Sequence, residues 1–165
     1  MEQDLARRFL ALAGAHNLIR PRGTAGLRSA LLSDLFGVFL GPYDTKGVIG
    51  DRIRVSSPEI VVGESGAITL ALVVHELATN SAKYGSLSAS TGIIDIVCVE
   101  DHDDIEVAWR ERCGRPIAPP AGPGGFGTRL VSRSVSGSLG GSMAFQWLAE
   151  GVVITIRMNK ARLLL

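Results

Sequence analysis

The segment 75–85 combines the pattern of a buried helix with a row of polar side chains, and the rest of the chain has to accommodate both. At about 100° per residue, Glu76, Asn80 and Lys83 fall within roughly 60° of one another on a helix. Apolar and small residues gather on the other side, at Leu70, Val74, Leu77, Ala78 and Ser81. Gly85 is typical of the position just past a helix end, where glycine tolerates a left-handed backbone. We therefore expect a helix with its polar row in the last turns.

This polar row suits a magnesium nucleotide. The side-chain carbonyl of Asn80 is a neutral hard ligand for Mg²⁺, and Glu76, one turn earlier, can orient or deprotonate a water bound to the ion. Lys83, one turn later, can meet a phosphate. An amphipathic helix with ordinary surface polar residues would show the same spacing, so the spacing alone leaves both interpretations open.

Composition narrows the class of protein. A chain of 165 residues can form one domain with a sizeable core, and 46% hydrophobic with 20% charged residues is typical of a soluble globular protein. The formal charge of +1 argues against broad binding to nucleic acid or anionic lipid. Cys98 and Cys113 follow no metal or redox spacing, so we expect reduced cytoplasmic thiols. No apolar run reaches membrane-spanning length, so we expect no membrane contact within this chain.

Periodicity predicts helices and strands on both sides of the central segment. Helices are expected over 2–19, over 24–42 with Thr24 as cap and Leu27, Leu31 and Leu35 at helical spacing, and over 130–139. Strand patterns occur at 52–55 and 59–62 as a short hairpin, at 92–100 and 104–109, and at 142–148 and 152–158 as a closing hairpin. A loop at 63–66 leads into the central helix. These elements predict an α+β fold, a mixed β-sheet covered on one face by helices.

Three motifs resemble those of sensor histidine kinases of the HWE family, which is named after a His in its N-box and a Trp-x-Glu farther on. The N-box resembles residues 75–85, the Trp-x-Glu resembles Trp109-Arg110-Glu111, and the second glycine box resembles residues 124–130. The motifs occur in the family's order. Residues 9–18 also resemble the stretch that joins the family's dimerisation helices to its ATP-binding domain, so the resemblance covers nearly the whole chain.

The resemblance implies a fold and a division of the chain. It implies the Bergerat fold shared with DNA gyrase, Hsp90 and the mismatch-repair ATPases, in which the nucleotide lies between the N-box helix and a flexible lid. Residues 1–20 would be the tail of a dimerisation helix or a linker helix, and residues 21–165 the ATP-binding domain. An ordinary N-terminal helix folded onto its own domain is the alternative for 2–19.

The resemblance also implies roles for individual residues. Asn80 would bind Mg²⁺, Glu76 would act on a water or on the transferring phosphate, and Glu111 stands where other histidine kinases carry an Asp that accepts a hydrogen bond from the adenine amino group. Glycines of the second glycine box could let backbone N–H groups approach phosphates near a helix start. The implied catalytic pair is Glu76 and Asn80, and the implied ATP-binding set is His75, Asn80, Lys83, Tyr84, Glu111, Gly114, Gly125, Phe126, Gly127, Thr128 and Leu130.

Glycine and proline crowd residues 113–127 without periodicity, which predicts a mobile loop, and the resemblance implies that this loop is the lid. One departure from the family pattern lies here. The family favours paired glycines followed by proline, whereas Cys113-Gly114-Arg115-Pro116 supplies one glycine and inserts an arginine. The departure predicts either an altered ATP affinity or an additional phosphate contact from Arg115.

The chain contains three histidines, His16, His75 and His102, and none has the neighbouring Arg and Asn expected of this family's phospho-acceptor. His102 lies between two aspartates, but three consecutive residues in a turn rarely converge on one metal ion, so we expect a solvated turn. The chain is therefore expected to be a fragment or truncated gene, or to act on a histidine supplied by another chain.

These inferences predict the catalytic domain of a bacterial two-component sensor histidine kinase. It would transfer the γ-phosphoryl group of Mg-ATP to a histidine on a dimerisation domain, and from there to an Asp of a response regulator. The alternatives are a non-catalytic, nucleotide-dependent interaction module and a Bergerat-fold Ser/Thr kinase of the anti-sigma type. Trp109-Arg110-Glu111 and His75 favour the histidine kinase over the Ser/Thr kinase.

Overall fold

A computed structural model of the chain describes residues 13–14, 17, 19–22, 27–43, 52–119 and 125–165. The described strands form two sheets. A three-stranded antiparallel sheet contains β1 (Arg20–Arg22), β2 (Leu27–Leu31) and β4 (Val61–Gly63). The five-stranded sheet has the order β3-β5-β6-β8-β7, with β3 at Ile53–Ser56, β5 at Ile93–Asp101, β6 at Asp104–Arg112, β7 at Ser142–Leu148 and β8 at Gly151–Asn159.

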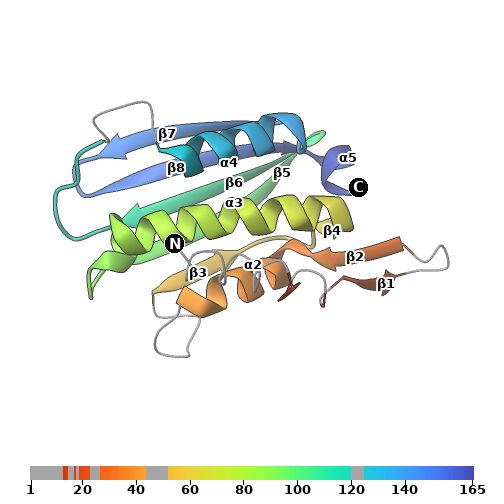
Figure 1. The fold of residues 1–165 in the computed structure, drawn as a ribbon, viewed down its shortest axis with the longest axis horizontal. Coiled ribbons are helices and arrows are strands. Elements are labelled where there is room, and N and C mark those ends of the chain that lie inside the picture. Colours follow the sequence, from red (N-terminus) through yellow and green to blue (C-terminus); the bar gives the residue numbers. More distant parts are fainter. Residues whose placement is uncertain (1–12, 15–16, 18, 23–26, 44–51, 120–124) are drawn as a thin grey trace.

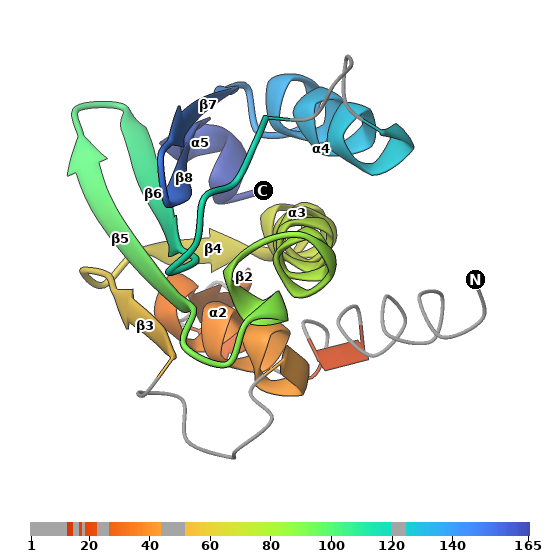
Figure 2. The same cartoon turned by 90° about the vertical axis from the view of Figure 1, so that its left-hand side faces the viewer.

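Three helices cover one face of the five-stranded sheet (Figures 1 and 2). They are α2 (Leu32–Leu40), α3 (Glu64–Lys83) and α4 (Phe126–Gly137), and α3 lies between the other two. A four-residue helix, α5 (Lys160–Leu163), and two 3₁₀ turns, η1 (Gly41–Tyr43) and η2 (Ser86–Ser88), complete the described elements. Among the described strands of the larger sheet, only β3 and β5 pair in parallel, so the predicted mixed sheet with helices on one face is confirmed.

The core lies between the sheet and these helices. Strand residues that face the helices alternate with outward-facing ones, as in a sheet with one buried face. On β6 the buried positions are Ile105, Val107, Trp109 and Glu111, and on β8 they are Val152, Ile154, Ile156 and Met158.

Burial also raises the pKa of Cys98 on β5 to about 11.

Two predictions at the N-terminal side were wrong. The helix expected over 24–42 is helical only from Leu32, because Leu27 and Leu31 belong to β2 and pair with β4. The hairpin expected at 52–62 does not form: β3 pairs with β5 of the larger sheet, whereas β4 pairs with β2 of the smaller one. The loop expected at 63–66 is already helix from Glu64.

The later elements are confirmed, although the helix expected over 130–139 runs over Phe126–Gly137, so its first two residues replace the end of the loop expected over 113–127. β5 and β6 pair across residues 102–103, β7 and β8 form the closing hairpin, and α4 buries Val131 and Val135, with Leu139 buried just past its end. No pattern in the sequence predicted helix α5. Of the helix expected over 2–19, Ala13, Gly14 and Asn17 are helical, and most of the rest lies outside the described residues, as does Thr24.

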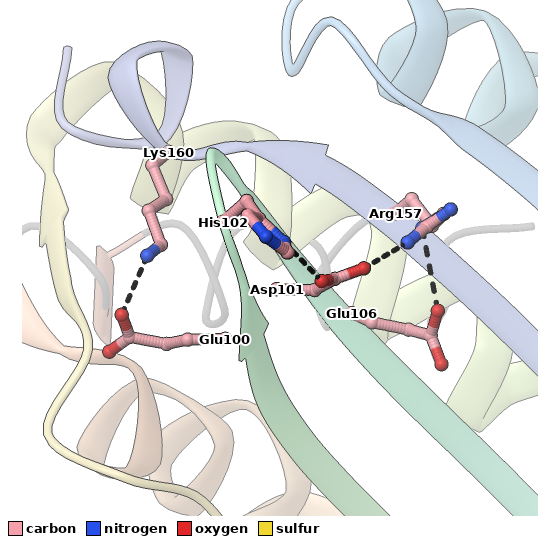
Figure 3. Close-up of polar contacts among 6 residues, drawn as sticks. All are labelled: Glu100, Asp101, His102, Glu106, Arg157 and Lys160. Atoms are coloured by element: carbon pink, nitrogen blue, oxygen red, sulfur yellow. Dashed lines mark hydrogen bonds and ion pairs between the residues drawn. The ribbon is translucent and has the colours of Figure 1, made fainter.

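The turn between β5 and β6 is solvated, as expected. The His102 side chain is 94% exposed, and its Nδ1 lies 2.8 Å from Oδ1 of Asp101 (Figure 3). The hydrogen bond from His102, together with the charge of Arg157, lowers the pKa of the Asp101 carboxyl. Arg157 also reaches Glu106, and Lys160 reaches Glu100, so this end of the sheet carries a network of exposed ion pairs.

Candidate functional site

The polar row of α3 lies in its last turns, as the spacing predicts. Glu76 is buried, Asn80 is half-buried and Lys83 is exposed, so the row runs from the core toward the surface. On the opposite side, Ala78 and Ser81 are enclosed, and their small size lets the helix pack closely on its neighbours. The buried face thereby fixes the direction in which the polar row points.

A cavity of about 850 Å³ lies beside these turns. Its walls come from the end of α3, the end of β6, residues 117–119, the start of α4 and the hairpin β7–β8. The structure therefore gathers most of the predicted site around one cavity, lined by His75, Glu76, Asn80, Lys83, Tyr84, Glu111, Gly125, Gly127 and Thr128.

Two of the predicted residues that the structure describes, Gly114 and Leu130, are not among those that line the cavity. Gly114 lies in a turn after β6 with φ of +64°, beside Thr91. Leu130 lies one turn farther along α4 than the lining residues Gly127 and Thr128. Nothing is described of the side chain of Phe126. Arg115 does not line the cavity either, since its guanidinium donates to the hydroxyl of Ser88 at 3.1 Å.

Glu111 is the buried acceptor that joins these elements. Its Oε2 accepts hydrogen bonds from the hydroxyl of Ser81 and from the backbone N–H of Ser86, both at 2.8 Å. Its Oε1 accepts the indole N–H of Trp109 at 2.9 Å. Residues two apart on a strand share a face, which explains why Trp and Glu occur with one residue between them. The Trp-x-Glu motif is thus a hydrogen-bonded pair in which Glu111 lines the cavity and Trp109 is buried behind it.

Two glycines allow the backbone to approach the buried carboxylates. A Cβ at Gly85 would overlap Oε2 of Glu111, and one at Gly127 would overlap Oε2 of Glu76. Gly85 does not adopt the left-handed conformation expected after a helix, because its φ is −103°. Close approach to Glu111, and not backbone handedness, is therefore the reason for glycine at position 85.

His75 is held by a residue that sequence reasoning missed. The phenolic oxygen of Tyr43 lies 2.9 Å from Nδ1 of His75 and 2.9 Å from the hydroxyl of Thr79. Tyr43 follows Pro42 in the turn after α2, where no periodic pattern distinguishes it. The network attaches that turn to the buried side of the N-box helix.

Helix α4 begins at the cavity. Its cap residue, Gly125, makes no side-chain capping bond, and the first N–H groups of any helix lack partners within the helix. Together with the helix dipole, these donors favour an anion. Gly127 brings this helix start next to Glu76, so the start of α4 and the polar row of α3 face the same space.

No family model matches the chain. Over 155 residues it is 30% identical to the blue-light-activated histidine kinases of Brucella ovis and of Brucella anthropi. This chain is a relative of histidine kinases. The match covers 92% of the chain but 30% of the length of each of those proteins, so it corresponds to one part of them.

Solved histidine kinases share the fold. The histidine kinase domain of a blue-light-activated histidine kinase from Erythrobacter litoralis superposes with a TM-score of 0.76 at 20% identity, covering 98% of this chain and 83% of that one. The catalytic domain of the histidine kinase ThkA gives a TM-score of 0.62 at 17% identity, covering 81% and 97%. The chain therefore has the fold of a histidine kinase catalytic domain.

Within the described residues, no helix is long and apolar enough to cross a membrane. In the same part of the chain, no three side chains of His, Cys, Asp or Glu come together as a metal site.

Proposed function

We propose that this chain is the ATP-binding catalytic domain of an HWE-family histidine kinase, and that it transfers the γ-phosphoryl group of Mg-ATP to a histidine on a dimerisation domain. One observation carries the proposal: the polar row of α3, the acceptor Glu111 and the start of α4 surround the same cavity. Its volume of about 850 Å³ is in the usual range for small-molecule sites.

The residues around the cavity fit a magnesium ion held mainly by phosphates. Mg²⁺ usually keeps several waters and takes few protein ligands, and the amide oxygen of half-buried Asn80 is a suitable one. Glu76, one turn earlier and deeper in the cavity wall, would accept from a metal-bound water. Bound Mg²⁺ would neutralise negative charge that develops on the phosphate oxygens during transfer.

Other residues would orient the nucleotide. The N–H groups at the start of α4 and the ammonium of Lys83 would bind phosphates, while Tyr84, 73% exposed, would lie along the ribose. Glu111 would accept the adenine amino group. Phosphoryl transfer depends mostly on positioning and on stabilisation of charge, so groups that hold the nucleotide in place are what the protein has to supply.

The partners follow from the same proposal. The attacking histidine would belong to a dimerisation domain, of which residues 1–20 would be the tail, and the phosphoryl group would pass to a response regulator. In support, the related fold of ThkA has been solved in complex with the response regulator TrrA, with a TM-score of 0.62 over 82% of this chain. An anti-sigma-type Ser/Thr kinase would use the same cavity, but the hydrogen-bonded Trp109 and Glu111 favour the histidine kinase over it. A non-catalytic nucleotide module would also use this cavity, and transfer of label from γ-labelled ATP to a dimerisation domain separates it from the kinase.

Calorimetry of Asn80→Ala tests the proposal. The variant should lose the Mg²⁺-dependent part of ATP binding, because it removes the proposed ion ligand, and should keep the native circular dichroism spectrum. Asn159→Ala is the matched control, since Asn159 caps α5 and does not line the cavity. Unchanged Mg-ATP affinity in Asn80→Ala would refute the assignment of Asn80.

A further inference from the structure

Two aromatic side chains line the cavity from β7, at the edge of the five-stranded sheet. The rings of Phe145 and Trp147 are stacked, with centroids 6.5 Å apart and planes inclined by 12°. Trp147 remains 37% exposed and Phe145 38% exposed, although both point to the face of the sheet that carries the helices. Large aromatic side chains left open inside a cavity are suited to contact with a flat apolar ligand surface.

Strand register places Trp147 in line with Glu111, with one strand, β8, between them. Glu111 pairs with Val152 across β6 and β8, and Val152 pairs with Trp147 across β8 and β7. Residues paired in this way lie on one face of a sheet, so the three form a row two strand spacings long, about 10 Å. The row has a hydrogen-bond acceptor at one end, an aliphatic floor at Val152 and an indole at the other end.

The acceptor at Glu111 is nearly saturated. A carboxylate offers about four acceptor positions, and three are taken by Ser81, Ser86 and Trp109. The remaining position, on Oε1, suits a ligand edge with one donor, such as the amino group of adenine. A guanine edge presents two adjacent donors and would leave one of them without a partner.

We propose that Trp147, with Phe145 stacked on it, is an aromatic wall that stacks against the adenine-nucleoside end of the ligand bound at Glu111. The inference rests on the proposed function, because it assumes that the cavity binds an adenine nucleotide. The nucleotide would then extend along the row, with its base over Val152 and its edge at Glu111, and its phosphates directed toward the start of α4. This assigns the hairpin β7–β8 a direct part in nucleotide affinity.

The protein's own residues 117–119 are the other group that could cover this aromatic wall. Residues 117–119 line the same cavity, and the backbone bonds Cys113 N–H to Glu150 and Ile117 N–H to Ala149 attach the root of that segment to the turn between β7 and β8. The one remaining acceptor position of Glu111, in the same row, favours the nucleotide over residues 117–119 as the group that contacts Trp147. The experiment distinguishes these two occupants.

The test measures Mg-ATP affinity by calorimetry for the native chain, Trp147→Ala and Trp147→Phe. Base stacking on an aromatic ring predicts a loss of about 5- to 150-fold in Trp147→Ala and a loss of under about threefold in Trp147→Phe. Leu148→Ala is the matched control, because Leu148 is the next residue, is also exposed, and does not line the cavity. It should bind Mg-ATP like the native chain.

Fluorescence provides a readout that does not depend on the stability of the alanine variant. The chain has two tryptophans, and Trp109 is fully enclosed, so nucleotide stacking on Trp147 should quench native emission and the quench should disappear in Trp147→Phe. If native protein binds Mg-ATP but Trp147→Ala binds it equally well, or if Trp147→Phe keeps the full quench, the aromatic wall is refuted and the proposed function stands. If the native chain binds no nucleotide, both are refuted.

Discussion

Glu111 joins β6, where it bonds to its near neighbour Trp109, to two residues far away in the sequence: Ser81 on α3 and Ser86 in the turn after that helix. Removal of any donor would leave a buried acceptor position unpaired, at a cost of about 1–3 kcal/mol. The resemblance to a Trp-x-Glu motif singled out Trp109 and Glu111 in the sequence. It did not predict the hydrogen bonds from Ser81 and Ser86 to Glu111, because these serines and the carboxylate meet only in the folded chain.

Gly85→Ala should destabilise the fold, because the new Cβ would overlap Oε2 of Glu111 and lie 2.9 Å from Cα of Ser81. We expect a loss of about 1–3 kcal/mol in the free energy of unfolding, measured in urea. Gly37→Ala is the control, since Gly37 lies inside α2 with nothing within 4 Å of its new Cβ. That change should stabilise the protein by about 0.5–1 kcal/mol. Equal stability of the two variants would contradict this role of Gly85.

Among the elements, those set by local pattern were predicted and those set by distant pairing were not. Helix α3 follows from a long run of helical spacing, and β7–β8 from two alternating runs around Glu150-Gly151. By contrast, Leu27 and Leu31 have the same spacing from Leu35 as helix residues, yet β2 is a strand because it pairs with β4. Which sheet receives β3 or β4 depends on partners far along the chain, which periodicity does not reveal.

The segment after β6 should become more ordered when nucleotide binds. Ile117 and Ala118 lie outside any helix or strand, and the backbone bond from Ile117 to Ala149 is long at 3.4 Å. Hydrogen exchange at these two amides should slow on adding Mg²⁺ and an ATP analogue, by up to about 100-fold at a ligand concentration near 100 Kd. Amides in the centre of β5, which does not line the cavity, provide the internal control. Equal exchange at Ile117 and Ala118 with and without ligand would refute the lid.

At the scale of the whole molecule, the layered fold was predictable but the aromatic wall was not. The order of three motifs indicated one family, and the structure confirms the mixed sheet with helices on one face. Phe145 and Trp147 alternate with neighbours as in any core-facing strand, so nothing in the sequence separates a cavity wall from ordinary core. Only the register across β6, β8 and β7 shows that Trp147 lies in line with Glu111.

The described histidines are poorly placed to accept a phosphoryl group. His75 is buried and bonded to Tyr43, and His102 lies in the exposed β5–β6 turn, at the opposite end of β6 from Glu111. His16 lies outside the described residues. Transfer requires an imidazole nitrogen aligned with the γ-phosphorus. We therefore expect the phosphoryl group to be accepted by a histidine supplied on a separate dimerisation domain.

The most direct test of this account is to incubate the purified chain with γ-labelled ATP and Mg²⁺, alone and with a dimerisation domain from a related histidine kinase. Acid-labile, base-stable label should appear on the added domain, and Asn80→Ala should abolish it while Asn159→Ala should not. The chain alone should remain unlabelled. Label on the chain alone that disappears when one of its three histidines is replaced would contradict the account. So would an added domain that stays unlabelled although the chain binds Mg-ATP tightly.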